Sequence, residues 1–178
     1  IVFILFILLF TWQIAAANNF PKQAAVPGGI INLPLKFPKV STPQGTFNNQ
    51  RITVSPYSEG NANWIAVIGL PLDLSPGDYS VIITSPVHQK IPIVVSDKHY
   101  RSSKLTIQNQ RMVTPNKEDL QRIEKERRER ERILRTFSEA NPFRQAFQAP
   151  LKGRVSSEFG VKRLFNNILR NQHMGIDI

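Results

Sequence analysis

The stretch Ser75-Pro76-Gly77-Asp78-Tyr79-Ser80-Val81-Ile82-Ile83-Thr84 combines a strong turn signal with a strand rich in β-branched residues. Similar short apolar runs, separated by Pro, Gly and Asn, lie on both sides of it at residues 30–35, 51–54, 64–68, 90–95 and 105–107. Short strands at such spacing predict a β-sandwich over residues 27–110. About 80 residues can bury a modest core without disulfide bonds, and the chain contains no cysteine.

A charged helix is predicted after the sandwich, over residues 117–137. Thr114-Pro115-Asn116 offers cap candidates, with the proline near the first helical position. Acidic residues precede basic ones by four positions in the pairs Glu118/Arg122, Glu124/Arg128, Glu126/Arg130 and Glu131/Arg135. Each such pair is worth only about 0.2–0.5 kcal/mol when exposed. Arginines interrupt a thin apolar stripe, which argues against a coiled coil. We therefore expect a connecting helix that docks at its two ends.

The net charge of +10 is concentrated in the second part of the chain. Residues 1–100 carry six Lys+Arg and four Asp+Glu, whereas residues 101–178 carry seventeen and nine. A basic half predicts an anionic partner, and no aromatic-basic interleaving typical of nucleic-acid binding is present. We expect anionic envelope polymers, with Arg127 and Arg132 as the best contacts because no acid lies four residues before them. A merely solvated helix face is the alternative.

The N-terminal residues predict export. Residues 1–10 are uniformly apolar, and Ala15-Ala16-Ala17 follows after a short break. This order is typical of a secretory signal peptide over residues 1–17, cleaved after Ala17, with residues 18–26 as a linker. An uncleaved membrane anchor is the alternative, although the run is short for a span of about 20 residues. The membrane is expected to be a partner only through this signal.

Two residues of zinc-ligand type, His173 and Asp177, stand four apart with Gly175 between them. An extended path over four residues spans roughly 13 Å, whereas two donors of one metal each lie within about 2 Å of it. The two side chains therefore meet only if the backbone bends, and Gly175 is where a bend costs least. A helix would also bring them together, but the glycine disfavours it. A hydrogen-bonded or solvated pair without a metal is the alternative.

The blocks Gly153-Arg154-Val155-Ser156-Ser157-Glu158-Phe159-Gly160-Val161-Lys162-Arg163 and His173-Met174-Gly175-Ile176-Asp177-Ile178 resemble the opening of the catalytic domain in the M23 (lysostaphin/LytM-type) zinc metallopeptidases. The resemblance implies that residues 150–178 begin a β-rich peptidase domain, with a first strand at 153–157 and a loop at 164–170 near the substrate cleft. It also implies that His173 and Asp177 are Zn²⁺ ligands. Lys162 departs from the arginine that is usual at its position. The family's later H-x-H strand, which supplies the third ligand and a catalytic histidine, does not follow. We therefore expect the front part of a longer protein, without a catalytic residue of its own.

Residues 27–110 are similar to the immunoglobulin-like module that precedes the peptidase in many Gram-negative relatives. The likeness lies in Pro27-Gly28-Gly29, in residues 64–78 and in the exit Arg111-Met112-Val113 followed by Pro115. The expected fold class is thus mainly β: an immunoglobulin-like β-sandwich, a linker over residues 111–149 with the charged helix, and the first part of a peptidase domain.

The resemblance implies an exported zinc metalloendopeptidase that hydrolyses peptide bonds in the stem peptides or cross-bridges of peptidoglycan. Its place would be the periplasm or envelope of a Gram-negative cell, and nucleic acid is not an expected partner. A catalytic zinc polarises the scissile carbonyl and activates water. One alternative is a non-catalytic envelope protein of the same family that binds cell wall or activates amidases. Another is an adhesion or scaffold protein built on the sandwich.

Overall fold

The computed structural model describes residues 19–139, 142–144, 146–170 and 172–178. The signal peptide expected at residues 1–17 lies outside them. In the part of the chain that is described, none of the helices has the length and apolar composition needed to cross a bilayer. The mainly β fold class expected from the sequence is confirmed, because many more of the described residues lie in strands than in helices.

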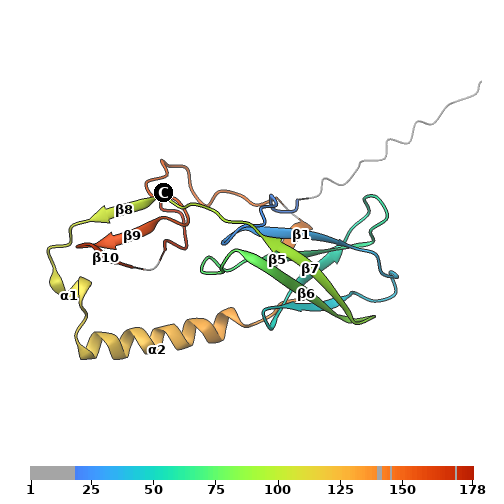
Figure 1. The fold of residues 1–178 in the computed structure, drawn as a ribbon, viewed down its shortest axis with the longest axis horizontal. Helices are drawn as coiled ribbons and strands as arrows, with labels where there is room; N and C mark the ends of the chain where they lie inside the picture. Colours follow the sequence, from blue (N-terminus) through green and yellow to red (C-terminus); the bar gives the residue numbers. More distant parts are fainter. Residues whose placement is uncertain (1–18, 140–141, 145, 171) are drawn as a thin grey trace, which may run out of the picture.

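Two antiparallel sheets face each other in the N-terminal module (Figure 1). One has the strand order β1-β5-β4, with β1 at Ile30–Leu35, β5 at Trp64–Gly69 and β4 at Thr53–Pro56. The other has the order β3-β2-β6-β7, with β3 at Gln50–Arg51, β2 at Gln44–Phe47, β6 at Gly77–Ser85 and β7 at Gln89–Val95. The stretch that opens with the Ser75-Pro76-Gly77-Asp78 turn therefore supplies a strand at the heart of the second sheet.

The sandwich core follows from the alternation of side chains along these strands. In β6, Val81 and Ile83 are fully buried, while Ile82 between them is only half-buried. In the facing sheet, Ala66 and Ile68 of β5 are also fully buried. Successive residues of a strand point to opposite faces, so each sheet turns one apolar face inward. This single cluster is the core of the module.

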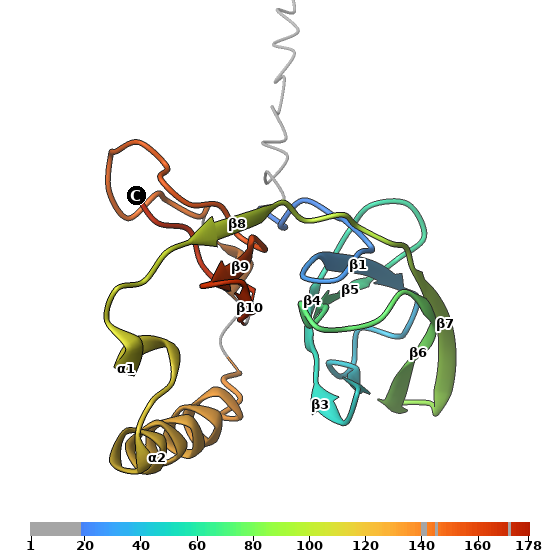
Figure 2. The same ribbon diagram turned by 60° about the vertical axis from the view of Figure 1, so that its left-hand side comes forward.

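A smaller sheet with the order β10-β9-β8 lies beside the sandwich (Figure 2). Here the structure corrects one expectation: the strand predicted at residues 105–107 is β8, at Ser102–Leu105, and it does not extend the sandwich. It pairs in parallel with β9, at Lys162–Phe165. Parallel pairing needs a long crossover connection, and here that connection contains both α-helices. A local sequence window contains no sign of such a pairing.

The C-terminal segment also differs locally from its prediction. Residues 164–170, expected to be a loop, include a hairpin between β9 and β10, at Ile168–Leu169. Asn166 and Asn167 form its turn with positive φ values of 50° and 65°, and paired positive φ angles suit a two-residue hairpin loop. The strand expected at residues 153–157 is reduced to an isolated bridge between Ser157 and Asp177.

The linking segment contains α1, at Gln110–Val113, α2, at Lys117–Leu134, and a short 3-10 turn, η1, at Pro142–Arg144. Asn116 is the N-cap of α2, since its side-chain oxygen accepts a hydrogen bond from the Asp119 backbone N–H at 2.9 Å. The proline thus precedes the cap and is not at the first helical position. The helix ends at Leu134, short of the expected residue 137.

Both ends of α2 are held, as expected for a connecting helix. Near its start, Arg111 binds Asp119 through two hydrogen bonds of 2.5 and 2.8 Å. Beyond its end, Phe137 lies under the guanidinium of Arg51 from β3, 4.0 Å from the ring centroid. The same arginine makes an ion pair of 2.8 Å with Glu139. The residues after Leu134 therefore leave the helix to pack on the sandwich.

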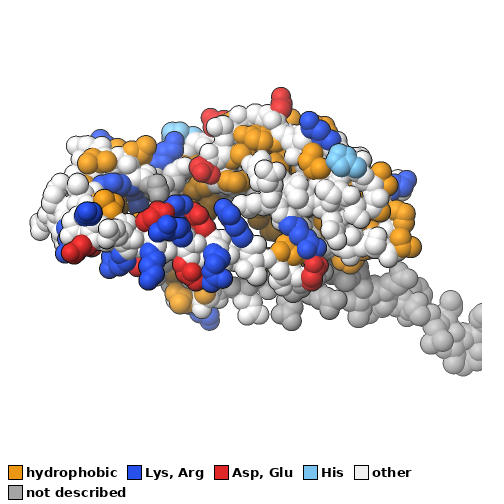
Figure 3. All heavy atoms as spheres, turned by 90° about the horizontal axis from the view of Figure 1, so that it is seen from below, with side chains coloured by type: hydrophobic (Ala, Val, Ile, Leu, Met, Phe, Trp, Pro, Cys, Tyr) orange, Lys and Arg blue, Asp and Glu red, His pale blue; other side chains and the backbone are white. Residues whose placement is uncertain are grey.

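The charge pairs on α2 correct the prediction for its arginines. Arg127 lies between Glu124 and Glu131, at 2.7 and 2.5 Å, and Arg132 pairs with Glu129 at 2.8 Å. Of the four predicted pairs, the described contacts include only that of Glu124 with Arg128, at 3.8 Å. Residues three apart are neighbours on a helix as much as residues four apart, and the prediction counted only an acid four residues before each arginine. Acidic and basic side chains are accordingly interspersed over α2 (Figure 3).

Candidate metal centre

The C-terminal segment is joined to the sandwich by a tight contact around Tyr100. The buried Tyr100 hydroxyl donates to the Pro27 carbonyl at 2.7 Å. The Tyr100 ring meets Phe159 edge to face, with centroids 6.4 Å apart. Gly160 adopts a φ of +84°, and a Cβ there would overlap the Tyr100 ring. The turn at Phe159 and Gly160 is thereby fixed next to the sandwich, and the candidate site begins directly after it.

Backbone hydrogen bonds align the segment before this turn with the last residues of the chain. The N–H groups of Gly160 and His173 reach the carbonyls of His173 and Val161 at 2.7 and 2.9 Å. Further along, the Asp177 N–H reaches the Ser157 carbonyl at 2.9 Å, and the Ser156 N–H reaches the Asp177 carbonyl at 2.8 Å. These bonds therefore hold His173 and Asp177 against the same segment, residues 156–161.

The structure brings His173 and Asp177 together. The backbone bends at Gly175, as expected, and His173 Nε2 lies 3.1 Å from Asp177 Oδ1. The His173 side chain is 13% exposed and that of Asp177 is 50% exposed. One donor atom is thus sheltered while the carboxylate remains open to solvent. Their role as zinc ligands stays a prediction.

The other nitrogen of His173 is oriented by its surroundings. Nδ1 lies 2.9 Å from the backbone carbonyl of Glu158 and 3.1 Å from Ser157 Oγ. A carbonyl can only accept a hydrogen bond, so Nδ1 carries a proton in this arrangement. In a neutral ring the lone pair is then on Nε2 and points toward Asp177 Oδ1. This histidine-to-carbonyl contact is the kind that fixes the tautomer of metal-binding histidines.

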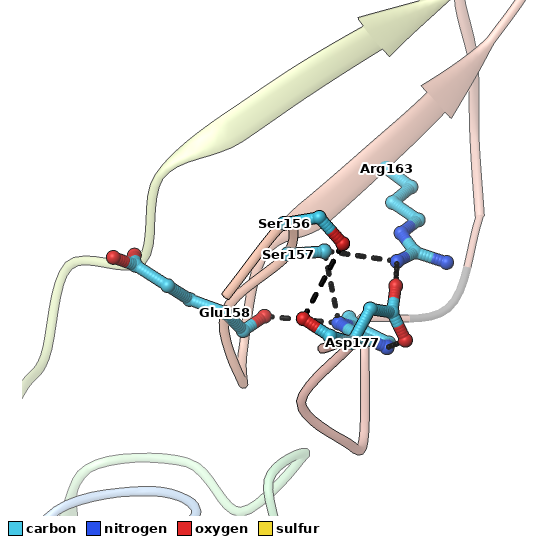
Figure 4. A network of polar contacts seen from close by, with 6 residues as sticks. Ser156, Ser157, Glu158, Arg163 and Asp177 are labelled. Carbon is cyan, nitrogen blue, oxygen red and sulfur yellow. Dashed lines mark hydrogen bonds and ion pairs between the residues drawn. The ribbon is translucent and has the colours of Figure 1, made fainter. Parts of the chain in front are cut away.

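Arg163 orients the carboxylate. Its Nη2 donates to Asp177 Oδ2 and to Ser157 Oγ, both at 2.9 Å (Figure 4). Because Arg163 occupies Oδ2, the second oxygen is left facing the imidazole. Sequence reasoning did not assign this role to Arg163, although the departure at Lys162, the residue before it, was the available signal. The exposed Lys162 makes no ion pair among the described residues.

His173 Nε2 and Asp177 Oδ1 are the two candidate donors to a metal. A lone pair on Nε2 and a carboxylate oxygen 3.1 Å apart repel unless a cation or a proton lies between them. Imidazole and carboxylate are ordinary zinc ligands, so the pair fits as two of the three protein ligands that a catalytic zinc takes. Within the described residues, no group of three or more His, Cys, Asp or Glu side chains gathers to hold a metal ion. If His173 is instead protonated, the two form an ordinary ion pair.

Comparisons with known proteins agree on one family. Residues 23–98 match the peptidase family M23 N-terminal domain. Among solved structures, a Pseudomonas aeruginosa protein assigned to the M23 peptidases is similar with a TM-score of 0.59 and 27% identity. The match covers 78% of this chain and 52% of that one, so the chain spans about half the length of this relative. No curated protein matches the chain significantly.

Proposed function

The chain belongs to peptidase family M23, and from that premise we propose that it acts in an exported zinc metalloendopeptidase that hydrolyses peptide bonds in peptidoglycan. The observation that carries the proposal is the 3.1 Å approach of His173 Nε2 to Asp177 Oδ1, with Nδ1 engaged by a backbone carbonyl. Export to the periplasm or cell envelope of a Gram-negative cell rests on the apolar N-terminal run. The substrates would be stem peptides or cross-bridges.

His173 and Asp177 would hold the zinc. The Glu158 carbonyl keeps the Nδ1 proton in place, so that Nε2 offers its lone pair. Arg163 holds one carboxylate oxygen and leaves the other for the metal. When bound, zinc supplies a Lewis acid for the scissile carbonyl. A third protein ligand and a general base are needed in addition, and the described residues do not contain them in this site.

The shortage of ligands favours a second candidate function. A member of the same family that binds cell wall or activates amidases without hydrolysis needs no complete zinc site. Within the described residues only two ligand-type side chains meet at the site. Zinc binding distinguishes the two functions. Hydrolysis requires a bound zinc, whereas cell-wall binding or amidase activation does not.

Zinc binding by the chain tests the proposal. Competition with a chromophoric chelator should detect weak binding at pH 7 that His173→Ala and Asp177→Ala each abolish. His88→Ala is the matched control, since His88 is exposed and lies far along the chain from the site. Unchanged zinc affinity in His173→Ala would remove this residue from the mechanism. Incubation with purified sacculi should release no soluble fragments, because a catalytic zinc takes three protein ligands.

A further inference from the structure

A groove adjoins the candidate metal site at His173. It has a volume of about 430 Å³ and is bordered by Met112 and Pro115 from the α1–α2 region and by Phe165, Leu169 and Arg170 from the β9–β10 hairpin. His173 lines it as well. This volume lies within the range of about 300–1,000 Å³ that small-molecule sites occupy. The apolar walls and the adjoining imidazole give it the general form of a binding site.

Arg170 lines this groove, and one of its hydrogen-bond donors, Nε, has no acceptor among the described residues. Its backbone N–H reaches the Arg163 carbonyl at 2.8 Å, and its Nη2 donates to the carbonyl of the buried Val113. The Nε atom is buried and finds no acceptor within the described part of the chain. A buried donor without an acceptor destabilises the folded chain. A rotation of the side chain that turns Nε toward the groove would let an acceptor on a ligand satisfy this donor.

The positive charge of Arg170 favours a negatively charged acceptor on the ligand. No aspartate or glutamate lines it in the described residues. The other arginine at its edge, Arg163, is already bound to Asp177 and Ser157. Among the described residues, Arg170 therefore has no carboxylate partner, and no negatively charged side chain lines the groove. Guanidinium groups bind carboxylates by two parallel hydrogen bonds, and Nε supplies one of the two donors needed.

We propose that Arg170 is a substrate-binding residue that holds a free carboxylate of a peptide in this groove, next to His173. The peptide chain would lie against the apolar side chains of Phe165, Leu169 and Met112. The proposal rests on the proposed function only in assigning the bound peptide to hydrolysis. Binding itself requires neither zinc nor turnover, so the two proposals can fail separately.

The test is a titration of the ¹⁵N-labelled chain with acetyl-D-Ala-D-Ala, observed at the Nε–Hε signal of Arg170. The free carboxylate should give a saturable shift, and the carboxamide of the same peptide should bind at least about tenfold more weakly, the loss expected for one charge-assisted hydrogen bond. Acetate should also bind at least about tenfold more weakly, because it cannot contact the apolar walls. This comparison of ligands needs no variant and so does not depend on whether a variant folds.

Two substitutions complete the experiment. Arg170→Gln should lower the affinity for the carboxylate peptide at least about tenfold, while Arg154→Gln, at an exposed arginine of the same segment, should leave it unchanged. The spectra also report whether each variant remains folded. Equal binding of peptide and carboxamide, equal binding of acetate, parental affinity in Arg170→Gln, or no saturable shift would each overturn the proposal.

Discussion

Single residues join the parts of this molecule, and Tyr100 is the clearest case. Its hydroxyl bonds a carbonyl at the start of the sandwich, 73 residues earlier, and its ring covers Gly160. A side chain at residue 160 would displace that ring, which explains why glycine suits the position beyond its φ of +84°. The same turn carries Glu158, whose carbonyl orients His173. The sandwich and the candidate metal site are therefore connected through one aromatic residue.

Tyr100→Phe tests this connection. The substitution leaves the buried Pro27 carbonyl without its donor, so unfolding in urea should show a loss of about 1–3 kcal/mol. Tyr79→Phe is the matched control, since it removes an exposed hydroxyl bond of 2.8 Å to the Ser75 carbonyl. Its effect should stay within about 0.5 kcal/mol. Equal losses in the two variants would show that the Tyr100 bond is worth no more than a surface contact.

Features that depend only on neighbouring residues in the sequence were predictable. The short apolar run at residues 30–35 and the cap candidates at residues 114–116 predicted β1 and the start of α2. The role of Arg163 was not predictable, because its partner Asp177 lies 14 positions away and meets it only through the fold. Gly175 marked the bend that joins His173 to Asp177, so the pair was predictable while its orienting contacts were not.

Two strands were not predicted correctly: β2, which has a weak sequence pattern, and β8, whose pairing partner lies far along the chain. β2, at Gln44–Phe47, contains Gln, Gly and Thr and lacks an apolar run. β8 was expected in the sandwich, yet its partner β9 begins 60 residues after it. Long-range pairing depends on tertiary contacts that a short window does not contain. The long helix was predictable because its charge pattern and cap are contained within its own sequence.

The turn between α1 and α2 has an electrostatic clamp with a defined pH dependence. Arg111 lowers the pKa of Asp119 below its ordinary value, first by a direct hydrogen bond and then by its charge. A carboxyl with a lowered folded pKa adds stability above its unfolded pKa of about 3.9. That stability is lost as the pH falls through the lower folded pKa. Around neutral pH the clamp is therefore fully formed.

A carboxyl titration followed by ¹³C NMR checks the clamp. Arg111→Gln removes both the bond and the charge, so the pKa of Asp119 should rise toward its ordinary value. Arg101→Gln is the control, because Arg101 pairs with Glu158 at 3.2 Å and not with Asp119. An Asp119 titration midpoint that stays the same in Arg111→Gln would mean that this ion pair does not form in solution.

At the scale of the whole molecule, α2 lies between two attachments. One is the Arg111–Asp119 clamp beside the C-terminal sheet, and the other is the contact of Arg51 with Phe137 and Glu139 on the sandwich. The chain thus leaves the sandwich along β8, returns along α2 and leaves again toward the candidate site (Figures 1 and 2). This path exposes the helix along most of its length, so the basic half of the chain is open to an anionic partner.

The corrected charge pairs change which arginines should meet such a partner. Arg127 and Arg132 are held by glutamates, whereas Arg130 and Arg135 make no ion pair among the described residues. An arginine bound to a carboxylate must break that contact before it binds a polymer, and a free one need not. We therefore propose Arg130 and Arg135, in place of Arg127 and Arg132, as the arginines that would contact anionic envelope polymers.

Sedimentation with cell-wall sacculi compares two variants of equal net charge. Arg130→Gln with Arg135→Gln should weaken binding at low salt more than Arg127→Gln with Arg132→Gln, which should instead lower helix stability by about 0.2–0.5 kcal/mol for each lost pair. The difference should shrink as the Debye length falls from about 10 Å at 0.1 M to about 3 Å at 1 M salt. Equal binding of both variants and the parent at low salt would leave α2 as a spacer between its two attachments.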